Sequence, residues 1–305
     1  MGLSVKNIFF KYTDIKTFFI TRLTESQIAE KVLIKKGSIV IDVTQRQSMI
    51  CLDPFCISVW LPSAQTGAFN AGGATLFFNK GGKTTASLKL SLIETVPTDN
   101  GTLLLYKIEQ VKNHQLTLIH RVALLGYLLR SKKNTYRSRR VISALYSYPR
   151  KIIIVSYQDS EYYNIFPMDI QGYIPEEDIY ILGLRTTNVT LDKILAAKKV
   201  VICESDEMDI ETIYKLGKHP STSPTKKEEM PFGITDSELF GFPVPAAIGG
   251  YKEVEIFYNR KMGYHMLLAG KVANNKAIRK EPASHYHVGF LQFQKSEYQS
   301  IEGIY

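Results

Sequence analysis

Cysteine and tryptophan are scarce in this sequence: three Cys and one Trp occur among 305 residues. Cys51, Cys56 and Cys203 lack metal-type spacing, and so small an odd set cannot build a disulfide framework. We therefore expect free thiols and a reducing, cytoplasmic location. The pair Cys51 and Cys56 is either a redox couple or, as we favour, two small apolar residues of a β-rich core.

Long hydrophobic runs are also missing. The longest apolar stretch, residues 116–129, contains His120 and Arg121 and is too short to cross a bilayer. Asp14, Lys16 and Arg22 interrupt the apolar residues near the N-terminus, so no signal-peptide pattern is present. These absences predict a protein without a membrane span.

The residues that are abundant favour strands. Hydrophobic residues make up 45% and charged residues 22% of the chain, which is typical of a folded protein. There are 18 Tyr and 15 Phe, and with the many β-branched residues they predict a mostly β fold with some helix (α+β).

Charge divides the chain into two unequal parts. Residues 1–140 contain 20 Lys and Arg against 8 Asp and Glu, a net charge of +12; residues 141–305 contain 18 against 21, a net charge of −3. This difference predicts a basic, β-rich N-terminal domain of unknown role over residues 1–140 and a second domain over residues 141–305.

The pattern of residues 1–140 predicts short strands separated by turns. Residues 37–43, 56–61, 74–78, 86–94 and 103–111 are predicted strands, which suggests a small barrel or sandwich. Residues 24–27 (TESQ) have capping-box spacing and precede several apolar residues, which predicts a short helix.

The second part mixes strands with helices. Strands are predicted over residues 151–157, 179–184, 200–203, 254–258 and 265–272, and helices over residues 190–197 and 210–216. Residues 219–231 are rich in Pro, Ser, Thr, Lys and Glu and are predicted to form a surface loop.

Four local patterns in residues 147–305 together resemble the flavin reductase-like, FMN-binding split β-barrel family. They are a strand at 149–154 leading to YNIFPM (163–168), GLRTTNVT (183–190) before a helix, IYKLGK (213–218) before a loop, and GYHMLLAGKV (263–272). Two positions depart from the family pattern: Tyr264 and Lys271 stand where acidic residues are usual.

The resemblance implies a bound FMN and assigns residues to it. The isoalloxazine rim would be Tyr163, Asn164, Ile165, Phe166, Pro167 and Met168. The phosphate would lie at Arg185, Thr186, Thr187 and Asn188, where a guanidinium and hydroxyls precede a helix N-terminus. A surface cation and an ordinary N-cap are the plainer interpretation of the second group.

Histidines are the remaining candidates for chemistry. The resemblance assigns a catalytic role to His265, which would hold a nicotinamide or polarise the flavin edge; a purely structural histidine is about equally expected. His285 and His287 alternate along a predicted strand, but no carboxylate or thiol has matching spacing. We therefore predict no metal site and expect these two side chains to face solvent.

Two classes of function follow. The first is an FMN-dependent oxidoreductase, a flavin reductase-like enzyme with a nicotinamide dinucleotide as donor; the second is a non-catalytic flavin- or ligand-binding sensor or interaction protein. Six cations between Arg130 and Arg140 lack an aromatic array, so nucleic-acid binding is not expected. A homodimer through the C-terminal barrels is predicted. An internal pair of barrels is the alternative, which we disfavour because no repeat is visible.

Overall fold

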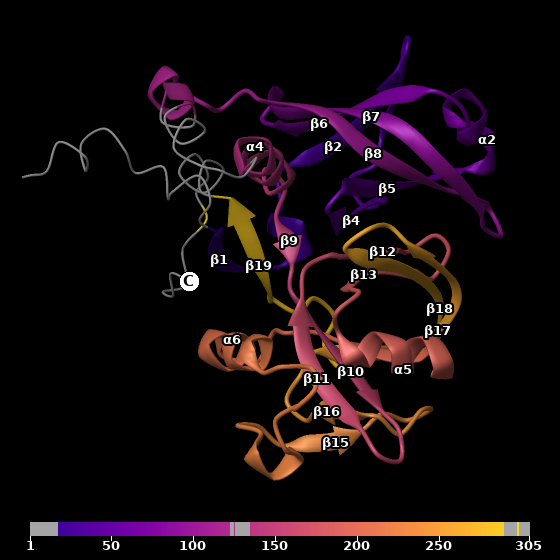
Figure 1. Ribbon diagram of the computed structural model, residues 1–305, viewed down its shortest axis with the longest axis vertical. Helices are drawn as coiled ribbons and strands as arrows, with labels where there is room; N and C mark the ends of the chain where they lie inside the picture. Colours follow the sequence, from indigo (N-terminus) through magenta and orange to yellow (C-terminus); the bar gives the residue numbers. More distant parts are fainter. Residues whose placement is uncertain (1–17, 123–124, 126–134, 290–297, 299–305) are drawn as a thin grey trace, which may run out of the picture.

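The computed structural model describes residues 18–122, 125, 135–289 and 298. The described chain is mostly β, with two seven-stranded sheets, a three-stranded sheet and a two-stranded sheet, and its paired strands are antiparallel (Figure 1). The α+β class predicted from the composition is confirmed. Among these residues no helix has the length and apolarity needed to cross a membrane.

The N-terminal sheet occupies one half of the molecule. Its strands are β2 (Lys31–Lys36), β3 (Ile39–Asp42), β4 (Gln47–Leu52), β5 (Phe55–Pro62), β6 (Gly73–Lys80), β7 (Lys83–Pro97) and β8 (Gly101–Asn113). The short helices α2 (Ser63–Thr66) and η3 (Gly67–Phe69) follow β5. The order across the sheet is β3-β2-β6-β7-β8-β5-β4.

The C-terminal sheet occupies the other half. Its strands are β10 (Ile153–Gln158), β11 (Tyr163–Met168), β12 (Gln171–Ile174), β13 (Ile179–Arg185), β14 (Lys199–Cys203), β17 (Gly250–Lys261) and β18 (His265–Ala277). Helix α5 (Val189–Ala197) follows β13. Helix α6 (Ile210–Lys218), η4 (Lys227–Glu229), β15 (Ile234–Asp236) and β16 (Pro243–Pro245) lie between β14 and β17. The order is β11-β10-β14-β17-β18-β13-β12.

The two sheets have the same topology. If the strands of each are numbered along the chain, both follow one order, with β2 matching β10, β5 matching β13 and β8 matching β18. They differ in their connections, because β6 and β7 are joined by the tight turn Gly81-Gly82 whereas β14 and β17 are joined by residues 204–249. This is the arrangement expected of an internal pair of barrels, the alternative that the sequence did not favour.

The two halves pack closely at β4. This strand lies against β12, β13 and β18, and one buried cluster contains Ile50 and Trp60 from the first half with Ile181 and Leu267 from the second. Gly183 permits the approach, because a Cβ there would lie 2.5 Å from the carbonyl oxygen of Ile50. The halves therefore share a continuous apolar interface.

A small third sheet also joins distant parts of the chain. Its order is β1 (Phe18–Leu23), β19 (Ser284–Gly289), β9 (Arg150–Lys151), so the first and last described strands pair (Figure 1). Helix α4 (Thr135–Leu145) packs on β7 and β8. The domain boundary at residue 140 stays a prediction; the two large sheets themselves end at Asn113 and begin at Ile153.

The helix predicted after residue 24 is wrong. The capping box does form, with the Gln27 side chain accepting from the Thr24 N–H at 2.8 Å, but it begins only the 3₁₀ turn η2 (Glu25–Gln27). The chain then enters β2, in which Val32 and Ile34 are buried and Lys31 and Lys35 are exposed. Alternation with period two placed these apolar residues in a sheet, and the local helix signal was overridden.

Candidate functional site

A cavity of about 350 Å³ lies in the C-terminal half, where β11, the end of β13, the loop after α6 and the start of β18 meet. Eight of the eleven residues predicted for the site line it. They are Asn164, Phe166, Pro167, Met168, Arg185, Thr187, Asn188 and His265. Residues from four separate segments of the sequence therefore converge on one space.

Strand β11 supplies the apolar wall. Asn164, Phe166 and Met168 alternate along the strand and line the cavity, as does Pro167. The predictions do not extend to their neighbours: Ile165 is fully buried in the core, and the Tyr163 hydroxyl binds the carbonyl oxygen of Thr225. The pleat explains this division for every residue except Pro167, because successive side chains leave a strand on opposite faces.

The polar end of the cavity is formed by Arg185 and Thr187. Arg185 is exposed at the end of β13, and no described carboxylate forms an ion pair with it. Thr186 does not line the cavity, because its N–H and hydroxyl donate to the carbonyl oxygen of Tyr264 at 3.0 and 3.3 Å. An exposed guanidinium beside a threonine hydroxyl is suited to an anionic oxygen group.

The N-terminus of α5 is less open than the sequence predicted. The Val189 N–H donates to the Ser221 hydroxyl at 3.1 Å, and the Thr190 N–H donates to the Asn188 side chain at 3.0 Å. The Leu191 N–H donates to the Asn188 carbonyl oxygen. An anion here would therefore meet the side chains of Arg185, Thr187 and Ser221, since these backbone donors are already occupied.

His265 begins β18 and is only 3% exposed. Its Nδ1 lies 3.5 Å from the Cys51 Sγ of the N-terminal half, and its buried Nε2 has no hydrogen-bond partner in the described chain. Burial, together with the charge of Arg185, lowers the pKa of His265 to about 4. The imidazole is therefore neutral at pH 7, with one unsatisfied nitrogen beside the cavity that it lines.

A second histidine, His219, lines the same cavity from the loop after α6. Its Nε2 is 2.7 Å from Oδ1 of Asn164, whose Nδ2 donates to the Thr190 hydroxyl at 2.8 Å. The buried Nδ1 of His219 has no partner among the described residues, and burial lowers the pKa of this side chain. Two neutral imidazoles with unsatisfied nitrogens thus border one cavity.

The expectation that His285 and His287 face solvent is wrong. His285 is buried, with Nδ1 2.7 Å from the carbonyl oxygen of Ser205. His287 lies between Asp169, 2.7 Å from its Nδ1, and the Tyr214 hydroxyl, 3.1 Å from its Nε2. Strand β19 is internal to the small sheet, so His285 is buried and His287 is largely covered by protein. The described residues contain no cluster of metal-binding side chains.

Asp169 connects His287 to the cavity, which it lines. Burial alone would raise the pKa of Asp169, but hydrogen bonds from His287 and Tyr146 and the charge of Arg150 outweigh that effect and lower it. The carboxylate is therefore ionised at neutral pH and adds a fixed negative charge to the cavity lining.

The cysteines of the N-terminal half and the cations near Arg140 make contacts of a structural kind. Cys51 and Cys56 face each other across β4 and β5, both buried and free, as expected for apolar core residues. Most of the cationic run lies outside the described residues. Of its described part, Arg139 is buried and Arg140 donates to the Val111 carbonyl oxygen at 3.0 Å.

Sequence reasoning missed half of the cavity wall. The residues it did not assign are Asp169, Ile170, Gly183, Leu184, Leu216, Gly217, His219 and Ser221. Leu216 and Gly217 belong to one of the motifs that carried the resemblance, so their position was available. His219 and Ser221 lie in a loop without periodicity, and no local signal marks them.

Comparisons with known proteins gave similarities among solved structures alone. No protein-family model and no curated protein matches the chain. Among solved structures, it is similar to the FMN-binding protein from Thermus thermophilus, with 17% identity, 43% of this chain and 72% of that chain covered and a TM-score of 0.38. It is also similar to the NADH:FAD oxidoreductase SgcE6 of Streptomyces globisporus (14% identity, 57% and 96% covered, TM-score 0.44). A third is the flavin reductase HpaC complexed with NADP⁺ (13% identity, 53% and 96% covered, TM-score 0.42).

Proposed function

We propose that the cavity binds FMN and that the protein is an FMN-dependent oxidoreductase that takes electrons from a nicotinamide dinucleotide. The observation that carries this proposal is the convergence of eight predicted residues around one cavity, together with the unsatisfied Nε2 of His265. A buried polar atom without a partner is costly unless a ligand satisfies it.

The residues fit a flavin in three ways. Phe166, Pro167 and Met168 offer an apolar wall for a planar ring, and the imidazoles of His265 and His219 offer hydrogen-bonding atoms for its polar edge. Arg185, Thr187 and the Ser221 hydroxyl would hold the phosphate. Because Ser221 accepts from the Val189 N–H, its own proton remains free to donate.

The chain's own contribution to the chemistry is orientation and charge. When bound, FMN supplies the hydride and electron transfer. His265 is neutral at pH 7, so it acts as a hydrogen-bonding group and not as a cationic acid. Asp169, ionised and fixed by His287 and Tyr146, keeps negative charge on one wall.

The purified protein is expected to be yellow and to release FMN, not FAD, on denaturation. Absorbance spectra before and after denaturation, with chromatography of the released flavin, measure this. A colourless protein that also fails to bind added FMN at micromolar concentrations contradicts the proposal. Consumption of NADH or NADPH by the FMN-loaded protein then tests the nicotinamide donor.

One observation favours the alternative, a non-catalytic flavin-binding sensor or interaction protein. Lys271, one of the two positions that depart from the family pattern, pairs with Asp99 of the N-terminal half at 2.6 Å, so this side chain serves the contact between the halves. Flavin binding without oxidation of either nicotinamide would support this alternative.

The oligomeric state and location remain proposals. The face of β12, β13 and β18 is covered by β4 of the same chain, so a homodimer through the C-terminal barrels would have to use another surface. Sedimentation at several protein concentrations tests the dimer. The three free, buried cysteines support a cytoplasmic location.

A further inference from the structure

A second cavity, of about 230 Å³, shares no lining residue with the flavin candidate site. It lies where β9, β12, β13, β17 and β19 meet the turn η2. Four tyrosines line it: Tyr148, Tyr173, Tyr180 and Tyr286. We call it the tyrosine cavity.

Three of these phenols have hydroxyl groups without partners. Tyr148, Tyr180 and Tyr286 are 9%, 5% and 3% exposed, yet no described residue forms a hydrogen bond with their hydroxyls, whereas Tyr173 donates to Asp178 at 2.5 Å. These hydroxyl oxygens are not among the fully buried atoms without a partner, so each is open to the cavity and available to a ligand. Burial raises the pKa of Tyr148 to about 12 and raises those of Tyr180 and Tyr286 well above their usual value. All three are therefore neutral hydrogen-bond donors at the wall of one cavity.

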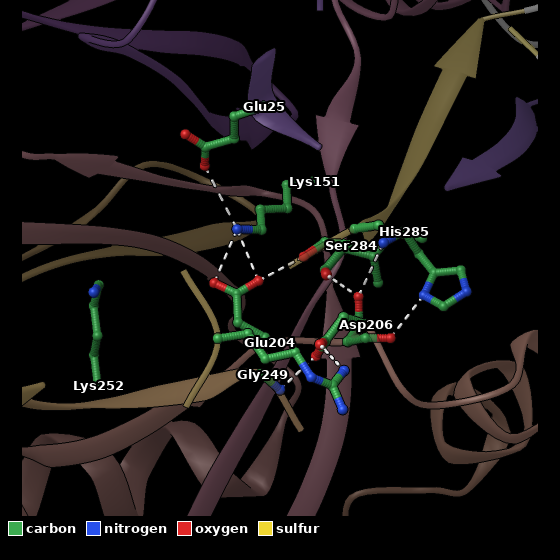
Figure 2. Close-up of polar contacts among 12 residues, drawn as sticks. Glu25, Lys151, Glu204, Asp206, Gly249, Lys252, Ser284 and His285 are labelled. Carbon is green, nitrogen blue, oxygen red and sulfur yellow. Dashed lines mark hydrogen bonds and ion pairs between the residues drawn. The ribbon is translucent and has the colours of Figure 1, made fainter. Parts of the chain in front are cut away.

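The charges around the cavity do not balance. Lys151 lies between Glu204, at 2.8 Å, and Glu25, at 3.6 Å (Figure 2). Lys252 stands apart from this network: its Nζ lies 4.8 Å from the centre of the Tyr173 ring and donates to Asn275, and no described carboxylate pairs with it. Burial lowers the pKa of Lys252.

Arg150 is a further cation of the lining, and its charge acts on the Asp169 carboxylate. It is buried and donates to the Leu145 carbonyl oxygen and the Gln47 side chain. The lining residues thus include three cations, Lys151, Lys252 and Arg150, against the two carboxylates Glu25 and Glu204. Of these cations, Lys151 is ion-paired and Arg150 acts on the Asp169 carboxylate, whereas Lys252 forms no ion pair in the described chain, and a bound monoanion would supply one.

We propose that the tyrosine cavity binds a small aromatic monocarboxylate, with its carboxylate toward Lys252 and the phenol hydroxyls and its ring against the tyrosine faces. The volume agrees with this class, because a cavity of about 150 Å³ is known to hold benzene and the tyrosine cavity has room for a carboxylate in addition. The three phenol donors match the acceptor oxygens of the anion.

Benzoate is the probe, and benzamide, which has nearly the same shape without the charge, is its control. Calorimetric titration of the full chain is expected to show saturable benzoate binding at one site, with a dissociation constant in the millimolar range or lower. Benzamide should bind about tenfold more weakly, the usual scale for a charge-assisted contact. Absence of saturable benzoate binding, or equal binding of the two compounds, would overturn the proposal.

Variants locate the site. Lys252→Met should reduce benzoate affinity about tenfold and remove the preference over benzamide, and Tyr286→Phe, which keeps the ring, should weaken it severalfold. Lys261→Met is the matched control, since Lys261 is exposed on the same strand β17. Circular dichroism checks that each variant is folded.

Competition separates this site from the flavin site. Saturating FMN should leave benzoate binding unchanged, because no residue lines both cavities. Displacement of benzoate by FMN, or a Lys252→Met variant that binds benzoate as tightly as the parent, would overturn the assignment. A protein that binds benzoate but never FMN would contradict only the flavin proposal.

Discussion

The two large sheets share one strand order, yet only the C-terminal half contains the flavin candidate cavity. Strands β11, β13 and β18 and the end of α6 form most of the cavity wall, and three connections complete it: residues 169–170 after β11, residues 187–188 between β13 and α5, and residues 219–221 after α6. In the N-terminal half the matching connections are the short α2 and η3 and the turn Gly81-Gly82. A common sheet therefore does not imply a common site, because the connections that complete the site differ between the halves.

The largest effect is expected at the contact between the halves. Leu267 is fully buried in the shared cluster, so Leu267→Ala should cost about 2–5 kcal/mol. Trp60, the sole tryptophan, belongs to the same cluster and reports on it. We expect its fluorescence change to precede the loss of circular dichroism during denaturant unfolding of this variant.

Leu76→Ala is the matched control for that experiment. Leu76 is equally buried but lies in the core of the N-terminal half, so the cost should be similar while the two signals change together. Coincident transitions in Leu267→Ala would mean that the halves unfold as one unit even when their contact is weakened.

The loss of stability at acid pH should arise from histidines of the C-terminal half. Burial lowers the pKa of His219, His265 and His285, which all lie there. For His265, with a folded pKa of about 4 against 6.5, the unfolded chain binds more protons between these values. Stability should therefore fall as the pH decreases from 6.5 to 4, by at most about 3 kcal/mol from this residue.

The measurement is the free energy of unfolding across that pH range in the parent and in His265→Gln. The variant should show a shallower loss below pH 6.5, because Gln does not titrate. Identical slopes would show that His265 titrates normally in the folded protein and would weaken its placement as a neutral group beside the cavity.

The next effect concerns the anion-binding end of the flavin candidate site. Arg185→Ala should weaken FMN binding by about 2 kcal/mol, roughly 30-fold, the scale of a lost charge-assisted contact. Arg140→Ala, in α4 and outside the cavity lining, should change it little. Fluorescence titration of FMN measures both, and equal losses would mean that the phosphate position is misassigned.

The sequence predicted strands better than contacts. Alternation and turn signals located the hairpins, and the local motifs brought Asn164, Arg185 and His265 to one cavity. It could not reveal that Cys51 contacts His265, because that contact joins residues 214 apart through packing of the two halves. It also missed the repeated strand order, since side chains in the two halves have diverged while the hydrogen-bonded register depends on backbone groups common to all residues.

The smallest effect tests whether Lys271 joins the halves. Lys271 and Lys276 lie on β18 with side chains 45% and 44% exposed, and each pairs with a carboxylate at 2.6 Å. The partner of Lys276 is Glu238 in the same half, so Lys276→Met should change the free energy of unfolding only slightly, as for other surface pairs.

The partner of Lys271 is Asp99 of the other half, and its Nζ also lies 3.9 Å from Glu177. That carboxylate is buried, binds Thr98 and the Asn100 N–H through Oε1, and has no described hydrogen-bond partner at Oε2. Removing the nearby cation leaves this charge less compensated, so Lys271→Met should cost about 1 kcal/mol, more than Lys276→Met. Urea unfolding at low and high salt measures both variants. Because salt screens exposed pairs more than buried ones, the difference between the variants should persist at high salt; if it vanishes, Lys271 is an ordinary surface cation and the buried Glu177 carboxylate does not depend on it.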